Sequence, residues 1–315
     1  MKYNLPEAVA LYLATRRSLG FALVKDGIEL QGLVRYSEKI GHAGPLTVSL
    51  TLQWAQLSQT VDRRYWATRL DIVRRFARFW IAYDPQTQIP PRGVFGPTYC
   101  RRAVHVYTPQ ELGGLLAATA ALASVHPWRA QTLTTLVGLL ACTGLRIGEA
   151  LGLSDADIDW ATGVLTIRHA KCGHARLVPV QSSTLAALAR YRTLREQTMA
   201  PGGVSTFFVT VWGKPLGYKR VSALFRRVCR QLGWTQKPIP RLHDLRHSFA
   251  VRTLLAWYRT GEPIEPKLWS LSTYLGHRHV TATYWYLSAV PELMQVCQQR
   301  FAAAQAWASG GIAHE

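Results

Sequence analysis

Apolar side chains over the first 83 residues of the chain recur at the spacing of helices. The pattern is clearest from Arg63 to Tyr83, where large apolar side chains return every three or four positions and lie on one side of a helix. The other side is strongly basic, with Asp71 as its main acidic residue. We therefore predict an amphipathic helix with a positively charged face. The arginines of this face are Arg64, Arg74, Arg75 and Arg78.

A stretch rich in proline and glycine, from Asp84 to Tyr107, interrupts the helical pattern. Proline lacks an amide donor and disfavours helix in the residue before it, so the stretch is expected to be extended. The four residues from Thr108 to Glu111 then combine a capping box with proline at the first helical position, which predicts a helix start. The domains expected from this pattern are a helical domain over residues 1–84, a basic linker over residues 85–107 and a second domain over residues 108–315.

The second part of the chain is mainly helical but contains one signal for a β-sheet. Residues 164–167 and 176–180 are short, apolar and β-branched, and the loop between them holds Lys171 and a glycine that suits a hairpin turn. We therefore expect a fold that is mainly α with a small β-sheet (α+β). The longest apolar run is too short and too polar to span a bilayer, and the N-terminus is a poor signal peptide. These features favour a cytoplasmic protein.

Composition adds a strong positive charge to this picture. The 315 residues include 37 Lys and Arg against 18 Asp and Glu, a net charge of +19. Because a large field of one sign attracts polyanions, we favour a nucleic acid partner over charge that only keeps the protein soluble. The basic face between Arg63 and Tyr83 is then interpreted as a contact to the DNA backbone, with an ordinary solvated face as the alternative. The five cysteines are odd in number, widely spaced and without a C-x-x-C pair, which indicates neither a disulfide framework nor a zinc site.

Four segments carry residue types that suit phosphate chemistry, although each alone has an ordinary explanation. In the first, an apolar helix ends at a glycine and Arg146 follows, with Glu149 three residues on and within reach as its partner. A surface arginine after a helix C-cap would look the same. The second segment is the hairpin loop with Lys171, and a lysine in such a loop is usually only solvated.

The other two segments contain histidine, arginine and tyrosine. His243 and Arg246 lie three residues apart and would share one face of a helix. Histidine exchanges a proton near neutral pH, and arginine can donate two hydrogen bonds to phosphate oxygens. The last segment holds His277 and the aromatic run from Tyr284 to Tyr286, for which core packing is the more common explanation.

Together, the four segments resemble the tyrosine recombinase, or phage integrase, family. The resemblance rests on the order and spacing of Arg146, the His-x-x-Arg pair, a Leu-Gly-His motif ending at His277, and a tyrosine nine residues later. It covers residues from about 107 to 290, with a weaker likeness in the N-terminal helices. Counting from His277 selects Tyr286 rather than Tyr284 as the nucleophile.

Two segments depart in part from the family's pattern. The hairpin is similar to the family's Lys-Gly-x-Lys-x-Arg-x-Val-Pro, but Cys172 replaces the first glycine and His174 stands where a second lysine is common. Ser288 occupies the position two residues after the tyrosine, where the family often has histidine. The hairpin lysine itself is retained.

The resemblance implies a complete set of catalytic roles. The tyrosine would attack a DNA phosphate and form a 3′-phosphotyrosine, while the two arginines neutralise the transition state. His243 would take the proton of the tyrosine, Lys171 would protonate the leaving 5′ oxygen, and His277 would hydrogen-bond the phosphate. No ATP, metal or other cofactor is expected. The implied catalytic residues are Arg146, Lys171, His243, Arg246, His277 and Tyr286, supported by Glu149.

The resemblance also implies partners. The helical core-binding domain and the catalytic domain would close around DNA as a C-shaped clamp, and protomers would form a tetramer on inverted-repeat half-sites of double-stranded DNA. Accessory or sister recombinases are further candidate partners, and the enzyme would be associated with the nucleoid. A C-terminal helix over residues 291–308 would be exchanged between protomers, or would instead pack on its own domain. The residues expected to contact DNA are Arg64, Arg74, Arg75, Arg78, Arg101, Arg102, Lys219, Arg220, Arg226 and Arg227.

Two other functions fit parts of this pattern. A type IB topoisomerase shares the chemistry but relaxes DNA, and a DNA-binding regulator would keep the fold with a decayed active site. The compact order of the motifs and the N-terminal helices favour recombination over relaxation. All six catalytic positions hold usable residues, which argues against the regulator.

Overall fold

The computed structural model places most of the chain in two units. The described residues are 4–58, 62–99, 104–122, 127–168, 175–199, 205–236, 239–260 and 262–288, together with 295, 298 and 302. The chain divides between Arg102 and Ala103. Among the described residues, no helix is both long and apolar enough to cross a membrane.

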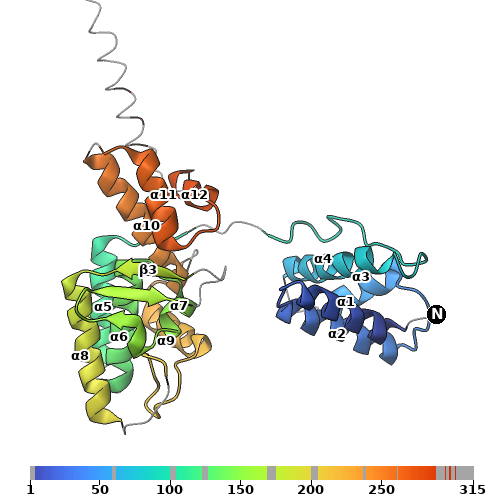
Figure 1. Ribbon diagram of the computed structural model, residues 1–315, viewed down its shortest axis with the longest axis horizontal. Coiled ribbons are helices and arrows are strands. Elements are labelled where there is room, and N and C mark those ends of the chain that lie inside the picture. The colour runs from blue at the N-terminus through green and yellow to red at the C-terminus, as the bar shows by residue number, and fades with distance from the viewer. Residues whose placement is uncertain are drawn as a thin grey trace, which may run out of the picture. The chain divides into compact units, whose positions relative to one another are not determined.

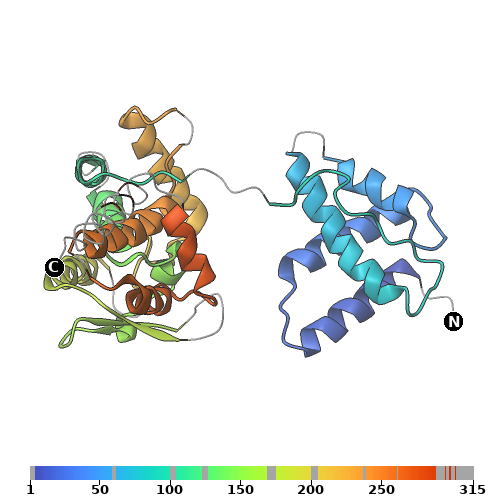
Figure 2. The same ribbon diagram turned by 90° about the horizontal axis from the view of Figure 1, so that it is seen from above.

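The described part of the first unit contains four helices, which pack around one apolar core (Figures 1 and 2). They are α1 (Leu5–Ser18), α2 (Val24–Lys39), α3 (Val48–Gln56) and α4 (Arg63–Trp80). A capping box between Asn4 and Glu7 starts α1. Trp54 and Phe76 are among the largest fully buried side chains of the core. The helices expected over the first 83 residues are therefore confirmed.

The apolar face of α4 is buried as expected, but one of its four predicted surface arginines is not at the surface. Arg74 is 6% exposed. Its Nε donates to the carbonyl of Pro90 at 2.9 Å, its Nη2 to the carbonyl of Pro91 at 2.6 Å, and its Nη1 to Asp71 at 2.8 Å. The chain after α4 folds back along the helix, and its carbonyls cover this guanidinium. The interpretation of Arg74 as a DNA-contacting surface residue is therefore wrong.

The proline-rich stretch after α4 has neither helix nor strand in its described residues, 84–99 and 104–107. Its first half packs against the first unit. Gln88 donates its backbone N–H to the carbonyl of Leu46 at 2.8 Å, and Phe95 is buried in the core of this unit.

Eight α-helices make up most of the second unit's described residues. They are α5 (Pro109–Ala121), α6 (Pro127–Thr143), α7 (Ile147–Leu151), α8 (Ser182–Thr198), α9 (Tyr218–Gln231), α10 (Leu242–Arg259), α11 (Ile264–Leu275) and α12 (Thr281–Ser288). The predicted capping box between Thr108 and Glu111 starts α5. The apolar helix α6 is central, because it packs against α5, α8 and α10. Figure 1 shows α11 and α12 together at one end of the unit.

A three-stranded antiparallel sheet completes the second unit. Its strands are β1 (Ile158–Asp159), β2 (Val164–Ile167) and β3 (Arg176–Pro179), in the order β1-β2-β3. Leu165 lies opposite Val178, and both are buried; the predicted pair of strands is confirmed. The fold is mainly α with a small β-sheet, as expected. The hairpin loop with Lys171, and the predicted helix over residues 291–308 except for three positions, lie outside the described residues.

Candidate active site

A break between two helices brings Arg146 into the second unit's site. The helix α6 ends at Thr143, and Gly144 follows with a φ of +62°. A Cβ at Gly144 would lie 2.6 Å from the ring of Phe249, so only glycine fits this turn. The chain then enters α7 with Arg146 at its N-cap. The helix end predicted at this glycine is confirmed.

Three arginines hold the C-terminal end of α11. Three successive carbonyls there each accept one hydrogen bond: Tyr274 from Arg176 (2.8 Å), Leu275 from Arg246 (2.7 Å) and Gly276 from Arg146 (2.9 Å). The last carbonyls of a helix have no partner inside the helix and carry partial negative charge, which suits cations. Because His277 follows directly, the same contacts fix the start of the segment that leads to Tyr286.

Arg246 is the most buried of the predicted catalytic residues that the structure describes, at 2% exposure. Its Nη1 donates to the carbonyl of Gly144 at 2.9 Å, while its Nη2 holds Leu275. Arg246 therefore ties the end of α6 to the end of α11. Burial, and then the nearby charge of Arg146, lower the pKa of Arg246 to about 10. The side chain therefore still carries its positive charge at neutral pH, in a fixed position.

Glu149 is a buried carboxylate shared by two arginines. Its Oε1 accepts from Arg146 Nη1 at 2.8 Å and its Oε2 from the Arg146 backbone at 3.0 Å, which confirms the predicted contact. Arg176 donates to both oxygens, at 3.1 and 2.8 Å. Burial opposes the charge of Glu149, but these hydrogen bonds outweigh it and hold its pKa below the usual range. Glu149 thus stays ionised and orients Arg146.

The two candidate tyrosines have different environments. Tyr286 is 3% exposed and lies near Arg246, whereas Tyr284 is 44% exposed. Burial raises the pKa of the Tyr286 hydroxyl above its usual value, although the charge and hydrogen bonding of Arg246, and then the charge of Arg146, act in the opposite direction. The geometry therefore favours Tyr286 as the tyrosine that shares a site with the two arginines.

The two predicted histidines also lie in this site. The ring of His277 stacks near that of Tyr286, with centroids 6.2 Å apart, and its Nδ1 lies 2.8 Å from the hydroxyl of Thr283. Burial, and then the charge of Arg246, lower the pKa of His277 to about 4. The same two causes lower the pKa of His243, which keeps contact with solvent. Both imidazoles are therefore neutral at pH 7 and able to accept a proton.

Two residues of the site were not identified from the sequence. One is Arg176, which stands as an arginine at the start of an otherwise apolar strand. The other is His247, whose ring lies 4.6 Å from that of His243 and 5.5 Å from that of Tyr286 between centroids. Burial, and then the neighbouring His243, lower the pKa of His247 to about 3, and its buried Nδ1 has no hydrogen-bond partner among the described residues. In the sequence, His247 could have been recognised as a site residue by its position one helical turn after His243.

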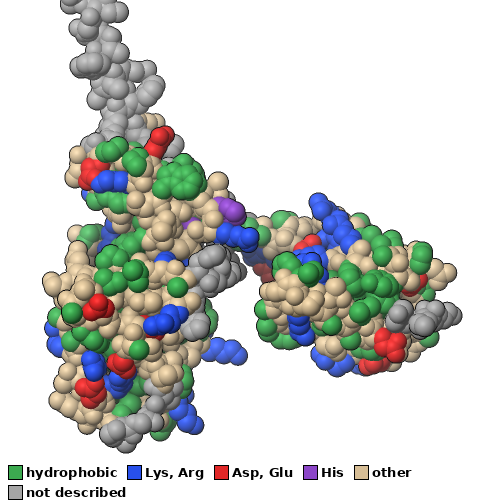
Figure 3. Space-filling model, viewed as in Figure 1, with side chains coloured by type: hydrophobic (Ala, Val, Ile, Leu, Met, Phe, Trp, Pro, Cys, Tyr) green, Lys and Arg blue, Asp and Glu red, His purple; other side chains and the backbone are tan. Residues whose placement is uncertain are grey.

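The basic residues expected to contact DNA occupy several kinds of position. Helix α9 buries Val221 and Phe225 on one side, and its other side carries exposed basic residues. On α4, Arg64 pairs with Asp62, Arg75 pairs with Asp26 and Asp71, and Arg78 is exposed. Arg101 and Arg102 lie outside the described residues. Figure 3 shows Lys and Arg side chains at the surface of both units. The exposed residues of α9 include Lys219, Arg220, Arg226 and Arg227.

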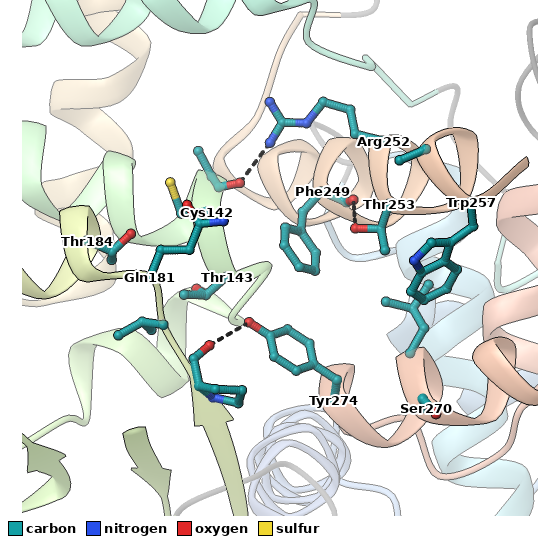
Figure 4. A pocket seen from close by; sticks show the side chains of 15 residues that line it. Cys142, Thr143, Gln181, Thr184, Phe249, Arg252, Thr253, Trp257, Ser270 and Tyr274 are labelled. Carbon is teal, nitrogen blue, oxygen red and sulfur yellow. Dashed lines mark hydrogen bonds between the residues drawn. The ribbon is translucent and has the colours of Figure 1, made fainter. Parts of the chain in front are cut away.

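A separate cavity of about 650 Å³ opens between α6, α8, α10 and α11 (Figure 4). The hydroxyl of Tyr274 points across it toward the carbonyl of Pro179, and Arg252 donates to the carbonyl of Ala141. None of the predicted catalytic residues that the structure describes lines this cavity. Within the described ranges, no cluster of three or more His, Cys, Asp or Glu could hold a metal ion.

Several known sequences are similar to this chain. The sequence profile of the phage integrase family matches residues 106–292. A relative provisionally named integrase/recombinase y4rB, from Sinorhizobium fredii, is 39% identical over 93% of this chain and 96% of its own length. The tyrosine recombinase XerC of Mesorhizobium japonicum is 34% identical over 51% of this chain and 48% of its own length.

Solved structures with a similar fold include complexes with DNA. The Tn1549 transposon integrase in complex with transposon right end DNA superposes with a TM-score of 0.66, at 18% identity, over 94% of this chain and 99% of that one. The lambda integrase dimer bound to a core site gives a TM-score of 0.61, at 17% identity, over 90% and 77% of the two chains. At these identities the likeness is one of fold.

Proposed function

The chain belongs to the phage integrase family of tyrosine recombinases, and from this we propose that it cleaves and rejoins DNA at a specific site through a covalent phosphotyrosine. One observation carries the proposal beyond family membership. The buried Tyr286 lies beside Arg246 and near Arg146, two guanidinium groups held in place by main-chain carbonyls. A nucleophile beside fixed positive charge is the arrangement that attack on a phosphodiester needs.

In the proposed reaction, the Tyr286 oxygen bonds to phosphorus as the bond from phosphorus to the 5′ oxygen breaks. Arg146 and Arg246 donate hydrogen bonds to the non-bridging oxygens, on which negative charge increases. The arginines need no reorganisation during the step, because Arg246 is already held by two carbonyls and Arg146 by a carbonyl and Glu149. The phosphotyrosine retains the energy of the broken bond, so a 5′ hydroxyl of another strand can reverse the step without ATP.

Three further residues are assigned roles, two in proton transfer and one in binding the phosphate. The raised pKa of Tyr286 means that the hydroxyl is protonated before attack, and His243 is a neutral acceptor in the same site. Lys171 is assigned as the acid that protonates the leaving 5′ oxygen. His277, held by the hydroxyl of Thr283, is assigned as a donor to the scissile phosphate.

The two units are assigned different roles in holding DNA. We assign residues 108–315 as the catalytic domain and residues 1–84 as the core-binding domain, joined by the basic linker of residues 85–107. The exposed basic face of α9, together with Arg75 and Arg78 on α4, would contact the phosphate backbone. Four protomers would assemble on paired half-sites.

The acid role of Lys171 can be tested with a modified leaving group. Lys171→Ala should slow cleavage of ordinary DNA, but not of a substrate with a 5′-thio leaving group, because sulfur leaves without a proton. The measurement is the single-turnover rate of covalent adduct formation on both substrates. If the thio substrate is cut as slowly as the ordinary one, Lys171 is not the acid.

The DNA-contact role of α9 can be tested by salt dependence. Arg226→Ala combined with Arg227→Ala should weaken binding to all sequences and flatten the log–log salt dependence by about one unit per lost phosphate contact. The matched control exchanges Arg190 and Arg192 on α8 for alanine, which removes the same charge from another helix. An equal change in slope for both pairs would show that only net charge matters.

The role of the C-terminal segment in assembly is a further prediction. Removing residues 291–315 should leave a folded protein that binds one half-site but no longer assembles cooperatively or exchanges strands. Native gel mobility on one and on two half-sites measures this directly. Loss of the thermal unfolding transition in the truncated protein without DNA would instead assign the segment to its own domain.

A further inference from the structure

Arg176, the first residue of β3, has every guanidinium nitrogen committed to the active site. Its side chain is 9% exposed. Its Nε donates to the carbonyl of Tyr274 at 2.8 Å, its Nη1 to Glu149 Oε1 at 3.1 Å and its Nη2 to Glu149 Oε2 at 2.8 Å. The side chain thus reaches from the sheet to α7 and to the end of α11. Neither target is part of the sheet from which it comes.

These contacts close a ring with Arg146. Both arginines donate to the carboxylate of Glu149, and they hold the carbonyls of Tyr274 and Gly276, which lie two residues apart. The ring leaves little room, because a Cβ at Gly276 would lie 2.8 Å from Arg176 Nη1. Arg146 therefore cannot shift without changing the contacts of Arg176.

We propose that Arg176 is a positioning residue, which fixes Glu149 and the end of α11 and so holds Arg146 in the orientation that meets the scissile phosphate. This inference rests on the proposed function of the site. Arg176 itself is not expected to bind the phosphate, because all three of its guanidinium nitrogens, Nε included, already donate to protein acceptors. Its planar guanidinium suits the role, since it grips the carboxylate at two points and still has a third donor for the carbonyl.

Loss of Arg176 has a definite consequence for Arg146. The Glu149 carboxylate is buried, with a side chain that is 3% exposed, and Arg176 supplies two of the hydrogen bonds that it shares with the two arginines. Without them, a buried carboxylate has to find other donors, and the guanidinium of Arg146 is already in contact with it. Arg146 would then turn toward Glu149 and away from the phosphate.

A charge-neutral substrate separates this role from a purely structural one. In a methylphosphonate, a methyl group replaces one non-bridging oxygen, so less charge has to be neutralised by Arg146. A variant that misplaces Arg146 should lose rate on the phosphodiester and much less on the methylphosphonate. A variant that only loosens the fold should lose rate equally on both.

The experiment measures single-turnover adduct formation on nicked duplexes that carry either linkage at the scissile position. For Arg176→Met we expect a loss of about 10–100-fold on the phosphodiester, by analogy with residues that orient the ligands of metal sites. We also expect the ratio of the phosphodiester rate to the methylphosphonate rate to fall, as it should for Arg146→Ala. In the Arg146→Ala background, Arg176→Met should cause little further loss. The control is Arg168→Met, which breaks the ion pair between Arg168 and Asp157 next to the same sheet. This variant should keep the wild-type ratio of the phosphodiester rate to the methylphosphonate rate.

Three results would overturn the inference. They are an unchanged rate for Arg176→Met, an equal loss on both substrates, and a full additional loss in the Arg146→Ala background. If Arg176→Met no longer unfolds cooperatively on heating, Arg176→Lys, which keeps the charge, is compared on the same two substrates instead. Its ratio of phosphodiester to methylphosphonate rate is expected to lie between those of the wild type and Arg146→Ala. Failure of the wild-type protein to form any adduct would reject the proposed function itself, and is seen before any Arg176 variant is compared.

Discussion

Tyr286→Phe is expected to bind its DNA site with unchanged affinity and to form no detectable covalent adduct. The substitution removes only the hydroxyl oxygen, which is the atom proposed to bond to phosphorus, and keeps the buried ring. Denaturing gels of the protein on a nicked duplex measure the adduct, and gel mobility under native conditions measures binding.

The matched control for this experiment is Tyr284→Phe. Tyr284 lies two residues away on the same helix and is 44% exposed, so its hydroxyl is not expected to contribute to cleavage. Adduct formed by the Tyr286→Phe protein, or lost in the Tyr284→Phe protein instead, would reverse the assignment. A suitable duplex can be obtained by selecting fragments that the protein binds from the DNA around its own gene.

The second large effect is expected for Arg246→Lys, with a fall of about 100–1,000-fold in the rate of cleavage, the usual cost of losing one preorganised donor. Lysine keeps the charge, but all its donors lie on one nitrogen, which does not reproduce the planar spread with which Arg246 reaches two carbonyls and the phosphate. The carbonyls of Gly144 and Leu275 both accept hydrogen bonds from Arg246. Each carbonyl left without a partner in the interior should lower the free energy of unfolding by about 1–3 kcal/mol.

The control must separate this loss of stability from the loss of chemistry. Arg252 lies on the same helix and also donates to a main-chain carbonyl, that of Ala141, but it lines the cavity rather than the active site. For Arg252→Lys we expect lower thermal stability and a nearly normal cleavage rate. Equal loss of cleavage in both variants would mean that Arg246 acts through the fold alone.

Much of the local backbone structure around this site was accessible from the sequence because its signals are local. A glycine that ends an apolar helix, a histidine and an arginine on one helical face, and a threonine–glutamate capping box each involve residues within about four positions of one another. The two strands of the hairpin were also predicted by their β-branched residues. In each case the structure places the backbone as the local pattern indicated.

The residues that sequence reasoning misplaced or missed depend on distant partners. Arg74 is buried by carbonyls 16 and 17 residues further along the chain, which no helical periodicity reveals. Arg176 joins Glu149, 27 residues before it, to Tyr274, 98 residues after it. The clues in the sequence were its position at the start of an apolar strand and its match to the arginine of the family's hairpin pattern. Tertiary contacts of this kind decide whether an arginine meets solvent, protein or DNA.

Identification of the residue bonded to DNA tests the central claim most directly. The wild-type protein is reacted with a nicked duplex, the adduct is digested with trypsin and nuclease, and the modified peptide is fragmented in a mass spectrometer. Cleavage after Arg278 and Arg300 yields residues 279–300, which contain both candidate tyrosines, so fragmentation between them assigns the site. We predict a 3′-phosphate on Tyr286. A phosphate on Tyr284 or any other residue, a 5′ linkage, or strand cleavage with no covalent adduct would contradict this assignment.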